Sequence, residues 1–362
     1  MLWQVTKPPA SGLYWLDEVH KNFYIELFDG KNFDDCFVDR FQPVLAASVK
    51  TKRLFQSVYN LYTALGLAEK IAFQALYQNH LSYQDCFDDT ALPVLRPAPG
   101  YADLWVAVKK LGGYLYSTTI GLDCFADAAI NDPSMDQHYE DYKALNGKVC
   151  CFCGTEEMME ERDIVPDEGN PENDEKQWRA SYDHYLPKKH YPFLAVDFNN
   201  LVPCCQKCNE KAKGEKDLLE NGGNRVLAFN PYQDTDGVRL IANYKCDGLK
   251  NIMSVEIEGT GCTLEDKGNT WNGTFLVLDR VNKRLNDFDS SWLAPSLNGC
   301  DNAETARNAL GQEAARCNAV KTTEREGYFK SLCFSEVLTK SDEQISDLLL
   351  AVEQIYSGRT LA

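Results

Sequence analysis

The sequence lacks any long apolar run. No stretch approaches the ~18 to 20 consecutive apolar residues that a membrane-spanning helix needs. The opening segment MLWQVTKPPASG also lacks the basic part and the apolar part of an export signal. Apolar residues still make up 44% of the chain and charged residues 25%, as in ordinary globular proteins. We therefore expect a folded, soluble protein that stays in the cytoplasm and contacts no membrane.

Positive charge is also scarce. The chain has 37 Lys and Arg residues against 54 Asp and Glu residues, which gives a formal net charge of −17. This balance excludes a protein that coats nucleic acid nonspecifically, because such proteins need broad positive surfaces. A nucleic-acid site on this chain must be confined to a local basic groove.

Cysteine is too sparse for a disulfide scaffold. The chain has 14 cysteines among 362 residues, whereas disulfide scaffolds contain more than ~8% cysteine. Thiols scattered along a chain are typical of a reducing cytosol. Eight cysteines lie singly, and the other six form two dense clusters: Cys150, Cys151 and Cys153, then Cys204, Cys205 and Cys208.

The length predicts two or three structural units, and the residue patterns predict the α+β class. We expect a mainly helical domain at 1–137, a domain with both cysteine clusters at 138–235, and a small sheet followed by helices at 236–362. Ser341 and Gln344 have the spacing of a capping box, which predicts the start of the last helix.

Local periodicity predicts individual elements. Apolar residues recur at helical spacing between 54 and 65, with Gly66 as the expected C-cap, and a second helix is expected at 69–80. A short helix at 137–146 leads into the first cysteine cluster. After Gly214 four short β-like runs predict a small sheet: RVLAF, VRLIANY, IMSVEIE and TFLVL.

Two cysteine pairs have the spacing of zinc knuckles: Cys150 with Cys153, and Cys205 with Cys208. In a knuckle two thiolates two residues apart bind one Zn²⁺, and a second pair completes the tetrahedral shell. Incidental buried cysteines are the alternative, and a shifted register would make Cys151 or Cys204 a ligand. We favour the two-residue spacer, because glycine follows one pair and proline precedes the other, as in turns.

The 51 residues between Cys153 and Cys205 are too many for a simple zinc ribbon, so an insertion is expected there. Asp183 and His184 lie on a short aromatic strand that Pro187 ends. An Asn-Leu-Val turn over 200–202 then leads to the second knuckle, and Asn209 follows it at the start of a predicted helix, NEKAKGEK.

In chain order these segments have the pattern C-x-x-C, D-H-x-x-P, N-L and C-x-x-C-N, which resembles the ββα-metal core of HNH endonucleases. The resemblance covers about a quarter of the chain, at 140–235. It implies that Asp183 and Asn209 hold a catalytic Mg²⁺ or Mn²⁺, that His184 is the general base, and that Asn200 fixes the loop that aims His184. The four knuckle cysteines would hold a structural Zn²⁺.

The resemblance also implies the reaction, which is hydrolysis of DNA phosphodiester bonds to 3′-hydroxyl and 5′-phosphate ends. The chain departs from the family pattern in two places. Asn209 replaces the last histidine, and its amide oxygen should still bind metal. The pair Lys213-Gly214 comes one residue later than usual, which weakens the expectation that this lysine contacts a phosphate.

The residue types suit this chemistry without the family. A histidine with a pKa near 6.5 can take a proton from water at neutral pH, which typically contributes ~10² to 10⁴-fold. A divalent cation on carboxylate and amide oxygens can stabilise the charge that develops on the phosphate. Successive strand residues point to opposite faces, so Asp183 can face the ion while His184 faces the water. We expect the other histidines at 20, 80 and 138 to be structural, whereas His190 is an extra ligand or a surface residue.

Lysines near the motif are expected to contact the phosphates of DNA: Lys188, Lys189, Lys211 and Lys213. The alternative is a solvated charged face, since Glu210 and Glu215 lie among them.

Between Glu156 and Glu175 ten carboxylates accompany a single arginine. We interpret this segment as a solvated insertion, and hold as a second hypothesis a damper that repels DNA from the site.

The residues in and around the motif further resemble those of bacterial HNH proteins that accompany an ATPase in phage-defence loci. This resemblance implies an ATPase partner and an antiviral role. Two chains pairing as a homodimer to cut both strands is a further expectation that the sequence leaves open. The rival function is a catalytically silent, zinc-stabilised scaffold that binds nucleic acid or a protein. A scaffold has no use for Asp183, His184 and Asn209 together, so the sequence favours the enzyme.

Overall fold

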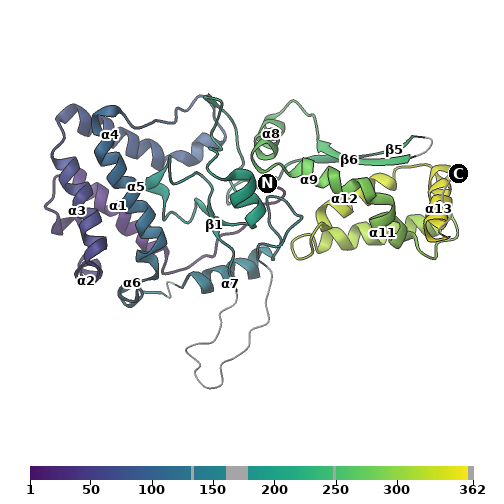
Figure 1. Ribbon diagram of the computed structural model, residues 1–362, viewed down its shortest axis with the longest axis horizontal. Helices are drawn as coiled ribbons and strands as arrows, with labels where there is room; N and C mark the ends of the chain where they lie inside the picture. The colour runs from purple at the N-terminus through teal and green to yellow at the C-terminus, as the bar shows by residue number, and fades with distance from the viewer. Residues whose placement is uncertain (132–133, 160–177, 248–249, 358–362) are drawn as a thin grey trace, which may run out of the picture.

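Helices form most of the molecule, and they are joined by small two-stranded antiparallel sheets (Figure 1). The computed structural model describes residues 1–131, 134–159, 178–247 and 250–357. The α+β class predicted from the sequence is therefore correct at this level. The first helices lie at one end of the molecule, the C-terminal helices lie at the other, and strand β1 lies between them (Figure 1).

The N-terminal region is helical, as predicted. Its helices are α1 (Tyr14–Phe28), α2 (Gln42–Ala47), α3 (Val49–Thr63), α4 (Leu67–Leu81), α5 (Ala102–Ser117), α6 (Asp123–Ala128) and α7 (Met135–Asn146). Short 3-10 turns connect them at Asp34–Cys36, Asp39–Phe41, Tyr83–Phe87, Pro99–Tyr101 and Thr119–Gly121. The expected C-cap at Gly66 is wrong, because α3 ends at Thr63 and its C-cap is Ala64. Gly66 is instead the N-cap of α4, where its N–H donates to the Glu69 carboxylate at 2.8 Å.

The middle region holds two short hairpins. Strand β1 (Tyr182–His184) pairs with β2 (Leu201–Pro203), with Asp183 opposite Val202. The turn predicted over 200–202 is thus mostly strand, because its residues complete this ladder. The β3 (Glu220–Asn221) and β4 (Asn224–Arg225) hairpin includes only the first residue of the run RVLAF. The 3-10 turn η7 (Pro192–Leu194) lies in the loop that joins β1 to β2, and the π-helix η8 (Lys207–Lys213) lies between the two hairpins.

The C-terminal region begins with a longer hairpin, β5 (Leu240–Asp247) paired with β6 (Lys250–Ile257), as predicted from the runs VRLIANY and IMSVEIE. The helices that follow are α8 (Thr263–Phe275), α9 (Val277–Arg284), α10 (Ala294–Leu297), α11 (Ala303–Ala319), α12 (Gly327–Val337) and α13 (Asp342–Ser357), with shorter turns η9 (Leu285–Asp287) and η10 (Asp289–Leu293). The capping box at Ser341 and Gln344 is confirmed by reciprocal backbone to side-chain bonds of 3.0 and 3.2 Å.

The predicted strand TFLVL is wrong. Its residues form the end of α8 and the start of α9, and Leu276 between them has a left-handed backbone with φ +52°. Trp271 and Phe275 lie four residues apart on α8, so both bury on one side of the helix. Burial of this helical face outweighs the β preference of the aromatic and branched residues.

The predicted first and second domains share one aromatic core. Phe193 of η7 is 1% exposed and packs between rings from three N-terminal helices. Its ring centroid lies 5.1 Å from Tyr24 of α1, 5.1 Å from Tyr77 of α4 and 5.9 Å from Trp105 of α5. The segment between the two cysteine clusters is therefore built into the N-terminal helices.

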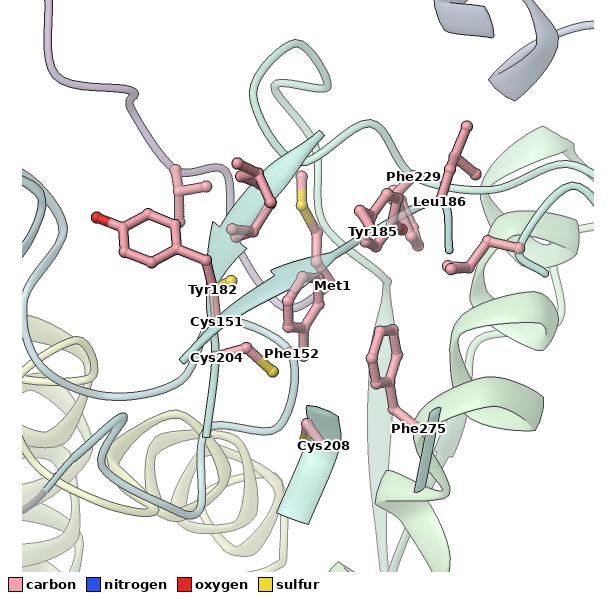
Figure 2. Packing of buried hydrophobic residues seen from close by; sticks show 14 of the residues in the cluster. Met1, Cys151, Phe152, Tyr182, Tyr185, Leu186, Cys204, Cys208, Phe229 and Phe275 are labelled. Carbon is pink, nitrogen blue, oxygen red and sulfur yellow. The ribbon is translucent and has the colours of Figure 1, made fainter. Parts of the chain in front are cut away.

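The first cysteine knuckle is packed against the C-terminal helices (Figure 2). Phe152, inside the knuckle, stacks on Phe275 with ring centroids 4.6 Å apart and on Tyr185 at 5.6 Å. Its carbonyl accepts a hydrogen bond from the Trp271 indole at 2.8 Å. The first residues of the chain also reach this point, since Leu2 N–H donates to the Cys151 carbonyl at 2.8 Å.

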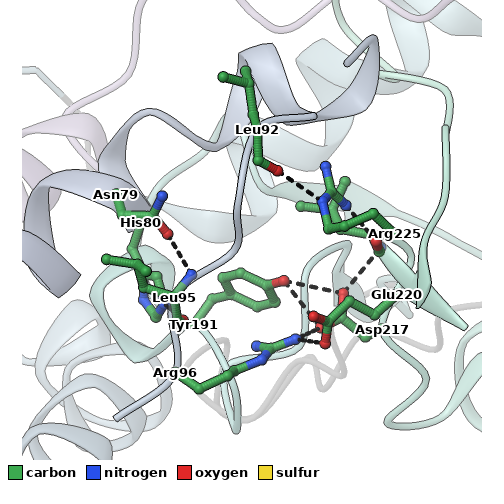
Figure 3. A network of polar contacts seen from close by, with 10 residues as sticks. Asn79, His80, Leu92, Leu95, Arg96, Tyr191, Asp217, Glu220 and Arg225 are labelled. Carbon is green, nitrogen blue, oxygen red and sulfur yellow. Dashed lines mark hydrogen bonds and ion pairs between the residues drawn. The ribbon is translucent and has the colours of Figure 1, made fainter. Parts of the chain in front are cut away.

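A polar network connects the loop after α4 to the β3–β4 hairpin (Figure 3). Arg96 pairs with Asp217 at 2.6 Å and also with Glu220, and the Tyr191 hydroxyl donates to Asp217 at 2.9 Å. Arg225 donates to the Leu92 carbonyl at 3.0 Å. Because the carboxylates are partly buried and shared, this network is a stronger link than an exposed ion pair.

In the described part of the chain, no helix is both long and apolar enough to cross a membrane.

Helix α5 contacts η7 closely at Gly112. A Cβ added there would lie 2.6 Å from the Pro192 carbonyl oxygen and 3.0 Å from the Ala195 Cβ, whereas one added at Gly113 would meet nothing within 4 Å. We expect Gly112→Ala to lower the free energy of unfolding by about 1 to 3 kcal/mol through overpacking. Gly113→Ala, the matched control, should raise it by up to about 1 kcal/mol through helix propensity. Thermal or denaturant melts measure both, and equal stabilities would contradict the close contact.

Candidate functional site

Four buried cysteines come together between the two halves of the molecule. The sulfur atoms of Cys150, Cys153, Cys205 and Cys208 all lie within 4.8 Å of one another. A tetrahedral site with Zn–S bonds of about 2.3 Å places its sulfurs ~3.8 Å apart. The Cys153 and Cys205 sulfurs are 3.8 Å apart, so the donor set and its spacing fit Zn²⁺.

Each cysteine pair is shaped by a tight backbone turn. Cys153 N–H donates to the Cys150 carbonyl at 3.2 Å, and Cys208 N–H donates to the Cys205 carbonyl at 3.1 Å. Gly154 completes the first turn with a left-handed φ of +63°, which glycine adopts without strain. Cys151 and Cys204 lie outside the four-sulfur cluster, so the cluster has the two-residue spacer rather than a shifted register.

Arg280 of α9 is a site residue that the sequence did not reveal. Its Nη2 lies 3.3 Å from the Cys208 sulfur and donates to the Phe275 carbonyl at 2.9 Å. Four thiolates on one Zn²⁺ carry a net charge of −2, which a neighbouring guanidinium offsets. No local signal could identify Arg280, because it follows Cys208 by 72 residues and belongs to no motif.

Asp183 is buried and is ion-paired with a lysine. Its Oδ1 lies 2.9 Å from Nζ of Lys213, and the two side chains are 3% and 1% exposed. The same ammonium donates to the His184 carbonyl at 2.8 Å. Burial raises the pKa of Asp183, although Lys213 opposes the shift. The other carboxylate oxygen, Oδ2, is buried and has no hydrogen-bond partner among the described residues, which leaves one oxygen suited to a cation.

The imidazole of His184 points to a different element. Its Nε2 lies 2.9 Å from the Ala195 carbonyl oxygen, and its ring centroid lies 4.5 Å from that of Tyr116. A carbonyl oxygen only accepts, so Nε2 carries the proton and Nδ1 keeps its lone pair. Burial, with the positive charges of Lys188 and Lys213, lowers the pKa of His184 to about 3. The imidazole is therefore neutral at pH 7, as a general base must be.

Asn200 fastens the loop that follows His184. Its side-chain oxygen accepts from Leu186 N–H at 2.7 Å, and its amide donates to the Leu186 carbonyl at 3.0 Å. Asn209 is half-buried in η8; its N–H donates to the Cys205 carbonyl at 3.0 Å, and its carbonyl accepts from Gly214 N–H at 2.8 Å. The bond from Gly214 spans five residues, the pattern of a π-helix.

The lysines expected to contact phosphates have different environments. Lys188 is exposed, with Nζ 5.1 Å from the Tyr116 ring centroid. Lys189 and Lys211 are also exposed, and Lys189 pairs with Glu215. The prediction that Lys213 contacts a phosphate does not fit the structure. Its ammonium is buried against the Asp183 carboxylate, so it cannot reach a phosphate in this arrangement.

Two of the other histidines bond to neighbouring groups of the fold, whereas His20 is buried against the Tyr24 ring, with ring centroids 5.2 Å apart, and its Nε2 has no hydrogen-bond partner among the described residues. His80 lies 3.1 Å from the Leu95 carbonyl, and His138 contacts the hydroxyls of Tyr14 and Tyr182. Most of the acidic segment from Glu156 to Glu175, and with it the damper hypothesis, lies outside the described residues, which stop at 159 and resume at 178. Its first carboxylate, Glu156, pairs with Lys207 at 2.7 Å and with Arg284 at 3.1 Å. At that end the segment is tied to η8 and α9.

Comparison with known proteins gives two partial matches. The chain is 32% identical over 99 residues to protein ea31 of Escherichia phage lambda, covering 27% of this chain and 26% of that protein. It is 34% identical over 87 residues to Septu protein PtuB of Bacillus thuringiensis, covering 23% of this chain and 32% of that protein. The chain thus spans about a quarter to a third of these relatives. No protein-family model matches the chain, and no solved structure matches it significantly.

We expect one zinc ion per chain, bound by the four-sulfur cluster. Cys205→Ser should abolish zinc retention and lower stability strongly, since structural zinc contributes on the order of 10 kcal/mol to folding. Cys204→Ser, the adjacent buried cysteine outside the cluster, is the control and should retain zinc. Elemental analysis after dialysis measures both variants. Wild-type protein that folds without zinc, or a zinc loss in Cys204→Ser alone, would contradict the assignment.

Proposed function

We propose that this protein is a metal-dependent endonuclease of the HNH type that hydrolyses phosphodiester bonds of DNA. The main support is the arrangement around His184: a neutral imidazole whose Nε2–H is held by the Ala195 carbonyl, leaving Nδ1 as the basic nitrogen. Beside it in β1, Asp183 keeps one carboxylate oxygen to which no residue in the described part of the chain bonds. The strand pairs with β2 and is followed by η8, in the order of a ββα unit.

In this proposal His184 takes a proton from the attacking water at Nδ1. The Ala195 carbonyl then stabilises the protonated ring, because it accepts the hydrogen bond from Nε2 more strongly once the ring is charged. Asp183 through Oδ2 and Asn209 through its side-chain oxygen would hold Mg²⁺ or Mn²⁺. When bound, this ion supplies the positive charge that stabilises the developing oxyanion.

Positive charge near the site suits a DNA backbone. Lys188 and Lys211 are exposed, and Lys188 lies over the Tyr116 ring that contacts His184. Because the net charge is −17, the chain cannot bind DNA through a broad positive surface. A local set of lysines is therefore the kind of DNA contact that this chain can make. Lys189 belongs to the same set once its pair with Glu215 opens, and that pair is weak because both side chains are exposed.

We assign the nuclease to anti-phage defence. The partial similarity to Septu protein PtuB supports this role. An ATPase partner protein and a homodimer that cuts both strands are further parts of the proposal, and they rest on the motif resemblance alone.

One observation favours the alternative, a catalytically silent zinc-stabilised scaffold. Lys213 neutralises Asp183 inside the protein, which is how a purely structural carboxylate would be satisfied. A scaffold and an enzyme differ in what they require of Asp183 and His184, so substitutions at these positions separate them.

We expect His184→Ala to reduce plasmid cleavage in Mg²⁺ or Mn²⁺ by at least about 100-fold, because a general base typically contributes ~10² to 10⁴-fold. Zinc content should not change, since His184 is not among the sulfur ligands. His190→Ala is the control on the same loop and should cut at the wild-type rate. Undiminished cleavage by His184→Ala would refute its role as base, and wild-type protein that binds DNA without cutting it would favour the scaffold.

We expect Asp183→Asn to lose cleavage because a neutral amide is a weaker ligand for a hard cation than a carboxylate. The amide oxygen can still accept from Lys213, but the buried ammonium loses its counter-charge, so the melting temperature should fall while the four-sulfur site persists. Raising the Mn²⁺ concentration should restore part of the rate, which a titration of cleavage against metal measures. Cleavage that is equal to wild type at every metal concentration would remove Asp183 from the metal site.

A further inference from the structure

The N-terminal helices contact the candidate catalytic histidine directly. Tyr116, in the last turn of α5, places its ring 4.5 Å from the His184 imidazole, with the two ring planes at 71°. The Tyr116 hydroxyl also approaches the Tyr182 carbonyl, at the start of the same strand, at 3.4 Å. One residue of α5 thus touches both ends of β1.

The second contact of His184 also depends on the N-terminal helices. Ala195, whose carbonyl holds Nε2, directly follows η7, and Phe193 of η7 is buried among rings of α1, α4 and α5. On the other side of Ala195, Asp197 lies 3.5 Å from Lys21 of α1. The Asp197 carboxylate accepts from Asn199 N–H at 2.8 Å, which shapes the turn before β2. The carbonyl is therefore held from both sides by the helical region.

These two contacts restrict the imidazole in different directions. The hydrogen bond to Ala195 acts in the plane of the ring and fixes which nitrogen carries the proton. The Tyr116 ring meets the imidazole at a steep angle, so it blocks rotation about the Cβ–Cγ bond. A turn of that bond by 180° would exchange the positions of Nδ1 and Cδ2 and remove the basic nitrogen from the water's side. Small losses of such orientation cost large factors in rate.

We propose that Tyr116 is a positioning residue for His184, and that the N-terminal helical region is a structural part of the catalytic site. This inference rests on the proposed nuclease function. Lys188 extends the arrangement toward solvent, with its ammonium 5.1 Å from the same Tyr116 ring. The order ammonium, phenol ring, imidazole places a phosphate-binding charge and the general base on one aromatic side chain.

The test compares three full-length variants on one helix. Tyr116→Leu removes the ring and should lower kcat at least tenfold with KM nearly unchanged, because DNA contacts remain. Tyr116→Phe keeps the ring and should restore kcat to within about twofold of wild type. Tyr114→Leu is the matched control, because Tyr114 lies two residues before Tyr116 on the same helix. Its ring centroid lies 4.6 Å from Nζ of Lys50, and loss of this ring should leave kcat unchanged. Zinc content and melting temperature are measured for all three.

A second readout does not depend on DNA cleavage. In ¹⁵N-histidine-labelled protein at neutral pH, His184 should show one tautomer with the proton on Nε2, identified by the loss of its signals in His184→Ala. Tyr116→Leu should broaden or average these signals, whereas Tyr116→Phe and Tyr114→Leu should not.

The outcomes separate the two hypotheses. If no protein cuts DNA but the His184 signals change only in Tyr116→Leu, the nuclease proposal fails and the positioning role stands. The positioning role is overturned if Tyr116→Leu matches wild type in kcat and in the His184 signals. It is also overturned if the loss of kcat in that variant only parallels a loss of zinc or of thermal stability.

Discussion

Four buried thiols within 4.8 Å of one another are the constraint on which the centre of this molecule depends. They bring together two chain segments that are 51 residues apart, and the strands β1 and β2 lie in the loop that this closure creates. Two strands of three residues have too few hydrogen bonds to be stable alone. Their geometry therefore depends on neighbouring contacts. These are the four-cysteine cluster, the stacking of Phe152 on Tyr185, and Arg280 beside the Cys208 sulfur.

The strand β1 serves two faces of the molecule with consecutive residues. Asp183 faces η8, where Lys213 balances its charge, and His184 faces α5 and the loop at Ala195. This separation follows from the alternation of side chains along a strand. It also explains why the fold is difficult to divide into domains, since one face of β1 contacts the region of the cysteine knuckles and the other contacts the N-terminal helices.

Several positive side chains of this acidic chain are paired with partners close to the four-cysteine cluster. Lys213, Arg280 and Arg284 are each engaged with buried or partly buried partners around the cluster. Among the exposed lysines that we expect to contact phosphates, Lys188 is linked to the site through the Tyr116 ring. A polyanion bound through a small number of lysine contacts would show a shallow salt dependence, because the slope scales with the number of phosphates that are neutralised.

Local spacing was enough to find the knuckle cysteines, the Asp-His pair, the helices at 69–80 and 137–146, and the capping box at Ser341, because each depends on neighbouring residues. Other features depended on contacts that no local pattern encodes. TFLVL became a helix junction because Trp271 and Phe275 bury together, and Arg280 reaches Cys208 from 72 residues away. Lys213 turned inward to Asp183 from the last residue of a π-helix, and Tyr116 reached His184 from α5. The sequence by itself determined which chemical groups are present and in what order. The tertiary structure decided which partners each group meets, because burial and charge pairing are properties of segments that only folding brings together.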